Sequence, residues 1–395
     1  MIIYDVLYHN EHGKLIKQLD DSMKICIIVT HYLPHIGGLE LATYHLAKEL
    51  DKQNNEVHII TPYPDSNENT TSIKIHRHPI HTYPDEHPIR AFVDGLTFFR
   101  KTVETINEIK PDIIHAQNIT NSIPAYIASK RYHIPYIICL HGALELMGPF
   151  LPACLKRFWP KLPHIKAASQ IIALTNEMAG RLEKELGRES VVIPNGVDTT
   201  HFYPSLTPEV SPHNPVIICL SRIDDKKGLE YAIKSMDDVL KHYPDAILNI
   251  VGDGNFRNEL EKIVWKHKLT KNVRFMGVVP NTDVPDLLRS ADIFLLPSLS
   301  EGFALTALEA MASGLPIIST PVGIIPEMVS KWNNGIIIPF KSSTAISNAI
   351  ISLLDHPNIR LEYGKQSVKA TREKYSWTTV AKKYEEIYQK IVSSK

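Results

Sequence analysis

The amino-acid sequence predicts an α/β protein with two Rossmann-like, doubly wound parallel-sheet domains that face each other across a cleft. Short runs rich in Val and Ile alternate with amphipathic stretches, which is typical of strands and helices that follow one another. This alternation stops in a proline-rich stretch and then starts again. In addition, the length of 395 residues exceeds the roughly 250–300 residues at which a single core stops growing.

The first domain is expected to span 23–200, after an N-terminal extension at 1–22. Runs that are apolar throughout indicate buried strands of a parallel sheet, because helices cover both faces of such a sheet. The predicted strands are Lys24–Thr30, Val57–Thr61, Ile73–His76, Asp112–Ala116, Tyr136–Leu140, Gln170–Ala173 and Val191–Ile193. Predicted helices include Leu39–Leu50, Phe92–Ile109 and Glu177–Leu186.

A linker is expected at 201–214, where prolines interrupt the apolar pattern, and the second domain at 215–395. Its predicted strands are Val216–Leu220, Ile247–Val251, Val273–Met276, Ile293–Leu296, Pro316–Ser319 and Gly335–Ile338. Helices follow from Thr344, and the last is expected to pack back on the first domain. Ligands of such sheets bind at the carboxyl ends of the strands, so we expect a site in the cleft between the domains.

The composition argues against several classes of protein. The 43 basic residues are balanced by 43 acidic ones without a Lys/Arg block, so nucleic acid is not an expected partner. Cys26, Cys139 and Cys219 stand in apolar runs and are expected to be buried thiols in a reducing compartment. No run of ~18 apolar residues predicts a membrane span, and no signal peptide is recognised. We therefore expect a cytoplasmic protein, at most peripheral on the cytoplasmic membrane face.

Paired glycines, Gly37 and Gly38, occupy the first strand-to-helix turn. Glycines there let backbone N–H groups approach an anion at the helix N-terminus, where the helix dipole favours negative charge. A tight turn without a ligand explains the pair equally well.

The corresponding turn of the second domain carries two cations, Arg222 and Lys227. Two cations at the carboxyl end of one strand suit a diphosphate, because Arg can hold two oxygens in a fork and Lys adds a compact charge. Taken alone, an exposed arginine and a solvated lysine would be the simpler interpretation.

The segment 300–310 follows a predicted strand and runs into a helix. Glu301 lies in the loop and Glu309 lies two turns further on, so both carboxylates can face the cleft. The loop between them offers helix N-terminal amides to a phosphate. Glu309 stands among small apolar residues, where an unpaired charge is costly, and this favours a ligand partner over a solvated helix face.

Several motifs in this chain occur together in the order and spacing of one enzyme family. They are Pro34-x-x-Gly37-Gly38-x-Glu40, His141-Gly142, Pro194-Asn195-Gly196-Val197-Asp198, Arg222 with Lys227-Gly228, Gly252-Asp253-Gly254, and Glu301-Gly302-Phe303 through Glu309. From about residue 24 to its end, the chain resembles the retaining glycosyltransferase family 4, the glycosyl transferases group 1, whose members have the GT-B fold.

This resemblance implies a donor site for a nucleotide diphosphate-sugar. Arg222 and Lys227 would hold the diphosphate, and Glu309 would accept hydrogen bonds from the ribose hydroxyls. Glu301 would hold the donor sugar, and 195–198 would shape the hinge. The implied catalytic residues are His141, Arg222, Lys227 and Glu301. The implied donor-binding residues are Gly37, Gly38, Arg222, Lys227, Val279, Glu301, Gly302, Phe303, Ala304, Leu305 and Glu309.

The implied reaction is transfer of a hexose from a UDP- or GDP-linked donor to a sugar, glycan or lipid-linked acceptor, with retention, in the biosynthesis of a cell-surface polysaccharide or glycoconjugate. No metal ion or other cofactor is expected, because the family needs none and no Asp-x-Asp pair occurs. The alternatives are a non-catalytic sugar-nucleotide-binding regulatory subunit and a GT-B-like phosphorylase or epimerase. An oxidoreductase is disfavoured, since neither first turn has the Gly-x-Gly-x-x-Gly pattern.

Two positions depart from the family pattern. Ala304 stands where a second glycine is usual, and it is expected to fit if its φ is negative. Ile324 stands in 321–327 where a glycine is common, so the backbone there is expected to approach a phosphate less closely.

The acceptor surface is expected in the first domain, with peripheral membrane contact through 150–166. Basic residues there alternate with aromatic ones: Lys156, Arg157, Lys161 and Lys166 with Phe150, Phe158 and Trp159. Such a stretch suits an anionic membrane or a lipid-linked acceptor. A solvated helix with its aromatic side chains packed inward is the simpler alternative.

Overall fold

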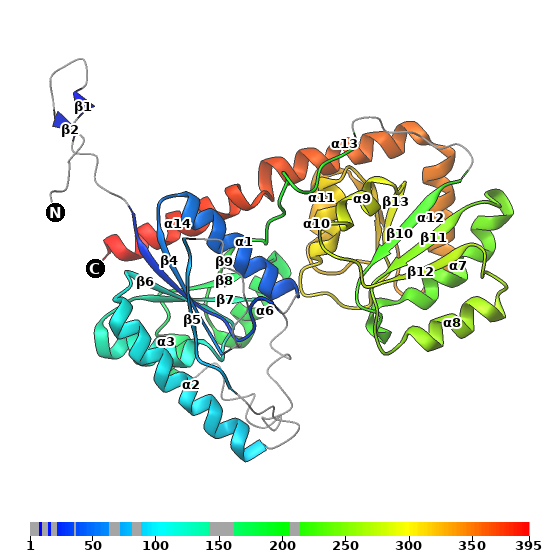
Figure 1. Ribbon diagram of the computed structural model, residues 1–395. Helices are drawn as coiled ribbons and strands as arrows, with labels where there is room; N and C mark the ends of the chain where they lie inside the picture. Colours follow the sequence, from blue (N-terminus) through cyan, green and yellow to red (C-terminus); the bar gives the residue numbers. More distant parts are fainter. Residues whose placement is uncertain are drawn as a thin grey trace.

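The computed structural model describes residues 8–9, 15–16, 22–34, 37–62, 72–80, 88–141, 162–205 and 214–394, and the statements below refer to them. They form two α/β domains side by side (Figure 1). Near the N-terminus, β1 (Tyr8–His9) and β2 (Leu15–Ile16) form an antiparallel pair. The predicted fold class, with two doubly wound parallel sheets, is confirmed.

The first domain is built on a parallel sheet of order β5-β4-β3-β6-β7-β8-β9. Its strands are β3 (Lys24–Ile28), β4 (Glu56–Thr61), β5 (Lys74–Arg77), β6 (Ile113–Gln117), β7 (Tyr136–Leu140), β8 (Gln170–Ala173) and β9 (Val191–Val192). Its helices are α1 (Gly38–Lys52), α2 (Pro88–Ile109), α3 (Ser122–Tyr132), α5 (Pro163–Lys166) and α6 (Asn176–Leu186). The predicted strands all occur, because runs such as those of β6 and β7 are buried along their whole length.

The second domain repeats this plan with the order β12-β11-β10-β13-β14-β15. Its strands are β10 (Val216–Leu220), β11 (Ile247–Val251), β12 (Val273–Gly277), β13 (Ile293–Leu296), β14 (Ile317–Ser319) and β15 (Gly335–Ile337). The 3-10 turn η3 (Asp225–Lys227) precedes α7 (Leu229–His242), and the other helices are α8 (Arg257–Lys266), α9 (Val284–Arg289), α10 (Leu305–Ala312), α11 (Ile325–Trp332), α12 (Ser343–Asp355), α13 (Pro357–Lys374) and α14 (Trp377–Ser393).

Both sheets reverse their strand order at the first strand of the domain. β3 lies between β4 and β6, and β10 lies between β11 and β13. The loops that leave two such neighbouring strands turn to opposite faces of the sheet and open a crevice at the carboxyl ends. The turns after β10 and β13, which carry the charged motifs, therefore border one crevice.

The chain crosses between the domains a second time at the junction of α13 and α14. There the Val197 amide donates to the Tyr375 carbonyl at 2.7 Å, and the Trp377 amide donates to the Val197 carbonyl at 3.2 Å. A Cβ atom at Gly196 would lie 2.9 Å from the Trp377 Cα, so only glycine allows this approach. Beyond the junction, α14 packs against α1 of the first domain, and Thr378 donates to Glu49 at 2.8 Å (Figure 1).

Three buried thiols lie within the sheets, since Cys26, Cys139 and Cys219 are at most 2% exposed. Burial raises the pKa of each of these thiols, which keeps them protonated. The expectation that they are core residues is confirmed.

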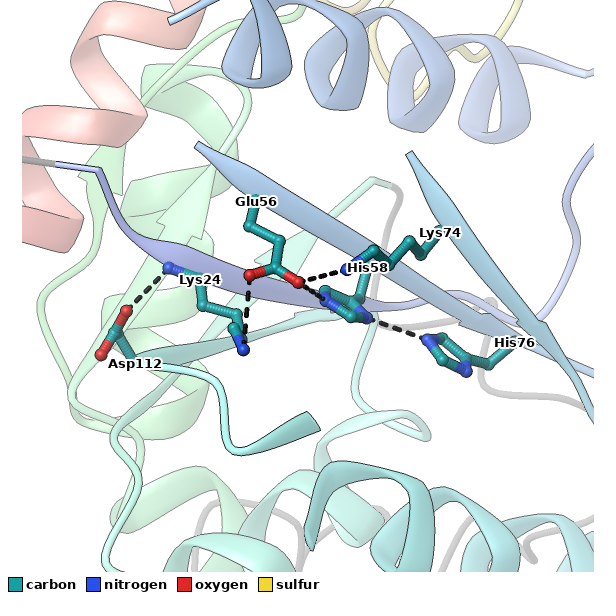
Figure 2. Close-up of polar contacts among 6 residues, drawn as sticks. All are labelled: Lys24, Glu56, His58, Lys74, His76 and Asp112. Carbon is teal, nitrogen blue, oxygen red and sulfur yellow. Dashed lines mark hydrogen bonds and ion pairs between the residues drawn. The ribbon is translucent and has the colours of Figure 1, made fainter. Parts of the chain in front are cut away.

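A polar cluster near the amino ends of β3, β4 and β5 has its charges paired within the protein. It comprises Lys24, Glu56, His58, Lys74, His76 and Asp112, and we call it the Glu56 cluster (Figure 2). Glu56 accepts from Lys74 at 2.5 Å and shares a 3.0 Å hydrogen bond with His58, while Lys24 lies 3.3 Å from its other oxygen. His58 and His76 join ring nitrogens at 2.9 Å. The register sets this cluster, because Lys24 pairs with Glu56 across β3 and β4.

Candidate active site

A cavity of about 500 Å³ lies at the carboxyl ends of the strands, and both domains contribute to its lining. Residues of the second domain that line it are Arg222, Asp224, Lys226, Lys227, Leu299, Ser300, Glu301, Gly302, Pro321, Val322, Gly323 and Phe340. Residues of the first domain that line it are Thr175, Glu177, Met178, Arg181 and Leu182, all at or near the start of α6. A site of this kind is complete only when the two domains are close together.

An ion pair between Lys227 and Glu301 lies in this cavity. The Lys227 Nζ is 2.8 Å from the Glu301 Oε1, and the two side chains are only 15% and 13% exposed. The buried hydroxyl of Ser298 donates to the same oxygen at 2.7 Å. Hydrogen bonds to charged groups are stronger than neutral ones, so the Glu301 carboxylate is held in place before any ligand binds.

A close approach of two backbone segments brings Lys227 to Glu301. Gly228 has a φ of +61°, and a Cβ atom there would lie 2.2 Å from the Pro297 carbonyl oxygen. The Leu299 amide donates to the Lys226 carbonyl at 2.7 Å across the same approach. Any other residue at 228 would push the turn after β10 away from the turn after β13.

Other cations at the cavity have no partner among the described residues. Arg222 and Lys226 come from the second domain, and Arg181 comes from the first domain. The side chains of these three form no hydrogen bond or ion pair with the described part of the chain. Unpaired cations next to a partly buried ion pair favour an anionic ligand, because the fields of several like charges add where solvent is partly excluded.

The loop between Glu301 and α10 contains a residue in left-handed conformation. Ala304, the N-cap of α10, has a φ of 80° and a ψ of 58°. The negative φ under which Ala304 was expected to fit does not occur. The physical reason is that the chain turns sharply from the buried Phe303 into α10, and a left-handed residue makes this turn.

The neighbouring loop contacts the same turn through Gly323. A Cβ atom at Gly323 would lie 2.6 Å from the Phe303 carbonyl oxygen, and Gly323 has a φ of +56°. The next residue, Ile324, has an ordinary φ of −83°, is 2% exposed, and its amide donates to the same carbonyl at 3.2 Å. A single glycine thus provides the close approach, while Ile324 packs into the core.

Glu309 lies on α10 and does not line this cavity. Its side chain forms no hydrogen bond with a described residue, and burial raises the pKa of its carboxyl to about 8. A hydroxyl donor from a ligand would stabilise the ionised form and lower this pKa.

Gly38 of the first domain approaches the start of α10. A Cβ atom at Gly38 would lie 3.2 Å from the Leu305 Cδ1. Gly37, the N-cap of α1, has extended backbone, with a φ of −152°.

His141 follows β7 and shares a hydrogen bond with Gln117, and burial lowers the pKa of its imidazole to about 4. His141 is therefore neutral at pH 7.

Of the predicted site residues, the cavity brings together Arg222, Lys227, Glu301 and Gly302. The predicted residues that do not line it are Gly37, Gly38, His141, Val279, Phe303, Ala304, Leu305 and Glu309. Gly142 and the stretch 150–161 lie outside the described residues. Among the described helices, none is both long and apolar enough to pass through a membrane.

The sequence reasoning missed the contribution of α6. The Asn176 amide and side chain donate to the two carboxylate oxygens of Glu327 in α11, at 2.9 and 2.6 Å, and so connect the two domains beside the cavity. Their position in the sequence could have indicated this contribution. Residues 175–181 follow β8 as Gly37 follows β3, so both segments lie at the carboxyl ends of the strands of the first sheet.

Two family models together match most of the chain. Residues 36–201 match Glycosyltransferase Family 4, and residues 208–370 match Glycosyl transferases group 1. The boundary between the two matches coincides with the proline-rich connection between the domains.

Similar proteins agree with these matches. The alpha-monoglucosyldiacylglycerol synthase of Acholeplasma laidlawii is 25% identical over 393 residues, which cover 94% of this chain and 98% of that protein. Sucrose-phosphate synthase from Thermosynechococcus elongatus has a similar structure, with a TM-score of 0.80 at 19% identity over 94% of this chain and 100% of that one. Anabaena HepE in complex with UDP and glucose gives a TM-score of 0.72 at 21% identity over 92% and 99%.

Proposed function

Because the chain belongs to glycosyltransferase family 4 and the glycosyl transferases group 1, with the GT-B fold, we propose that it is a retaining hexosyltransferase. It moves a hexose from a UDP- or GDP-linked donor to a sugar, glycan or lipid-linked acceptor and keeps the anomeric configuration of the donor. The observation that carries this proposal is the unpaired Arg222 beside the Lys227–Glu301 ion pair, at a cavity lined by both domains. A diphosphate supplies the negative charge that Arg222 lacks in the protein alone.

The proposed chemistry follows from where charge develops. Breaking the bond between the anomeric carbon and the phosphate oxygen leaves a sugar with oxocarbenium character and a diphosphate with new negative charge. Arg222 and Lys227 stabilise that charge, and the ion pair with Glu301 holds Lys227 in place before the reaction. The departing phosphate oxygen accepts the proton of the acceptor hydroxyl on the same face, so no protein base and no metal ion enters this step.

The remaining predicted residues bind and position the donor in this proposal. Glu309 accepts hydrogen bonds from the ribose hydroxyls, and Glu301 accepts from the donor sugar. The amides after Gly302 contact the phosphate. Since His141 is neutral at pH 7, it acts as a hydrogen-bonding group and not as a cation. Closure of the domains would bring Gly37 and Gly38 to the donor, and Gly38 already lies near Leu305.

We further propose a cytoplasmic enzyme, in peripheral contact with the membrane, that acts in the biosynthesis of a cell-surface polysaccharide or glycoconjugate. The name of the Acholeplasma relative, a glucosyldiacylglycerol synthase, supports a lipid-linked acceptor. The complex of Anabaena HepE with UDP and glucose supports a nucleotide-linked donor.

A thermal-shift panel of UDP-, GDP- and ADP-sugars tests the donor site. One nucleotide sugar is expected to stabilise the wild type, by about 2.7 kcal/mol at a hundredfold excess over its Kd. Glu309→Ala should lose this stabilisation. Glu259→Ala, which removes an exposed glutamate of α8, should keep it. If no nucleotide sugar stabilises the wild type, the donor-site proposal fails.

Turnover with the donor so identified tests the reaction. Mass spectrometry of a panel of soluble and lipid-linked acceptors should detect one added hexose, and the anomeric proton of the product should match the configuration of the donor by NMR. An inverted product would contradict the proposed mechanism. Donor binding without transfer to any acceptor would instead favour a regulatory subunit.

A further inference from the structure

A second cavity, of about 1040 Å³, lies at the opposite edge of the second sheet. It is lined by residues at the amino ends of three strands: Val216 of β10, Asp292 before β13, and Pro316 before β14. The site proposed above lies at the carboxyl ends of the same strands, and the five-residue strand β10 spans about 16 Å. The two cavities share no lining residue.

One face of α13 forms a wall of this cavity. Eight α13 residues with helical spacing line it: Arg360, Leu361, Gly364, Lys365, Val368, Lys369, Arg372 and Glu373. The side chains of Lys365, Lys369 and Arg372 are exposed and form no hydrogen bond or ion pair with the described residues. Three unpaired cations within two turns repel one another, so a bound anion would stabilise this face.

The opposite wall adds a further cation. Arg289, in the last turn of α9, hydrogen bonds to Asp286 and lies 4.4 Å above the ring of Tyr203. Its Nη1 is buried and has no hydrogen-bond partner in the described structure. The Arg289 guanidinium thus adds positive charge at this wall.

The acidic residues of the lining offset little of this charge. Asp292 lies 3.5 Å from the buried Arg360 and accepts the Val216 amide at 2.9 Å, so its carboxylate is already paired. The other acidic residue of the lining is Glu373. Leu315, Pro316 and Val368 supply apolar surface beside the cations. A phosphate on a ring-shaped body, such as a sugar or a nucleoside, fits this combination of charge and apolar surface.

The cavity also lies where a movement of the domains relative to each other would change the positions of its lining residues. Pro204 and Asn214 line it from the connection between the domains, and α13 continues into the second crossing at α14. The turn after α10 packs tightly against α13, since a Cβ atom at Gly364 would lie 2.3 Å from the Gly314 carbonyl oxygen. The helix α10 lies between Gly302, which lines the first cavity, and Ser313, which lines the second.

We propose that this cavity binds a phosphate-bearing metabolite and that this binding changes the affinity of the site at the carboxyl ends of the strands for its nucleotide. A ligand that contacts α13, Pro204 and Asn214 of the interdomain connection, and the turn after α10 would change its contacts if these elements moved relative to one another, which is the physical requirement for coupling. This inference goes beyond the proposed function, because its ligand is neither donor nor acceptor.

Titration calorimetry on the full chain tests the site, with inorganic phosphate, glucose 1-phosphate and AMP as probes. At least one probe should bind the wild type, and the double variant Lys365→Ala/Lys369→Ala should weaken it at least tenfold. Lys374→Ala, on the same helix but not in the lining, should bind as the wild type does. Arg222→Ala should also keep the binding. No binding, no effect of the double variant, or loss in Arg222→Ala would each overturn the proposal.

A second titration measures the coupling. The Kd of UDP or GDP, whichever binds, should change about five- to a hundredfold when the probe saturates the second cavity. The double variant should show no such change while keeping its own affinity for the nucleotide. An unchanged Kd in the wild type would overturn the regulatory part, and this result does not depend on whether sugar transfer occurs.

Discussion

Two charged regions of this molecule differ in whether their charged side chains have partners within the protein. In the Glu56 cluster, each oxygen of the Glu56 carboxylate has a cation or an imidazole beside it (Figure 2). At the cavity between the domains, Arg222 and Arg181 have no protein partner in the described structure. Glu309 on the adjoining helix α10, outside the cavity lining, forms no side-chain hydrogen bond with a described residue. The difference indicates that the first region stabilises the fold, whereas the second is arranged for a ligand that supplies the missing charge.

Removing an unpaired charge from the cavity is expected to have the largest effect. Arg222→Ala should lower kcat/KM roughly 10²–10³-fold, the usual loss when one group that stabilises transition-state charge is removed. The free energy of unfolding should change little, because Arg222 has no partner in the described structure to lose. Steady-state kinetics and urea unfolding measure the two quantities. Arg274→Ala, an exposed arginine of β12 outside the cavity, is the control and should retain activity. A loss of stability without a loss of activity in Arg222→Ala would reverse the comparison.

The pH dependence of the free energy of unfolding tests the state of the Glu309 carboxyl group. Burial raises its folded-state pKa to about 8, above the ordinary value of 4.5, so the folded protein keeps a proton that the unfolded chain releases. The free energy of unfolding therefore falls as pH rises from 4.5 to about 8. Glu309→Gln removes this loss and should be more stable than the wild type at pH 9, by about 1–3 kcal/mol, with a smaller difference at pH 5. Urea unfolding at both pH values measures it, and a difference independent of pH would contradict the assignment.

Glu56 is expected to show the opposite dependence on pH. The hydrogen bond from Lys74, and then that with His58, lowers the pKa of Glu56 to about 2. Its contribution to stability is therefore present above pH 4.5 and is lost as pH falls towards 2. The side chain is 40% exposed, so solvent screening limits the loss in Glu56→Gln to about 0.5–1 kcal/mol at pH 7.

Chemical denaturation at pH 7 and pH 3, together with turnover, checks this contrast. The difference between Glu56→Gln and the wild type should shrink at pH 3, while kcat stays within twofold at pH 7. Glu259→Gln, which removes one partner of an exposed pair with Lys262, should change neither quantity. Loss of activity in Glu56→Gln would mean that the cluster serves more than the fold.

More of the cavity between the domains than of the Glu56 cluster could be predicted from the sequence. The strands and the residues Arg222, Lys227 and Glu301 were predictable, because apolar runs and motifs are local and the carboxyl ends of parallel strands meet at one edge. The Glu56 cluster depends on register between β3, β4 and β5, which no local pattern specifies. Asn176 and Glu327 are 151 residues apart, and only the relative position of the domains brings them together. Alanine itself gives no sign of a left-handed backbone, so the φ of Ala304 could not be predicted either.

The backbone strain at Ala304, in the loop next to the cavity, leads to the smallest expected effect. A left-handed conformation costs an L-residue about 1–2 kcal/mol, and the extra freedom of glycine in the unfolded chain offsets about 0.5–1 kcal/mol of the gain from removing it. Ala304→Gly should therefore raise the free energy of unfolding by about 0.5–1 kcal/mol. Lys268→Gly, at a φ of 58° and remote from both cavities, is the matched control and should give a similar gain. Urea unfolding of both variants checks this. If only Lys268→Gly is stabilised, contacts of the Ala304 methyl group outweigh its backbone strain.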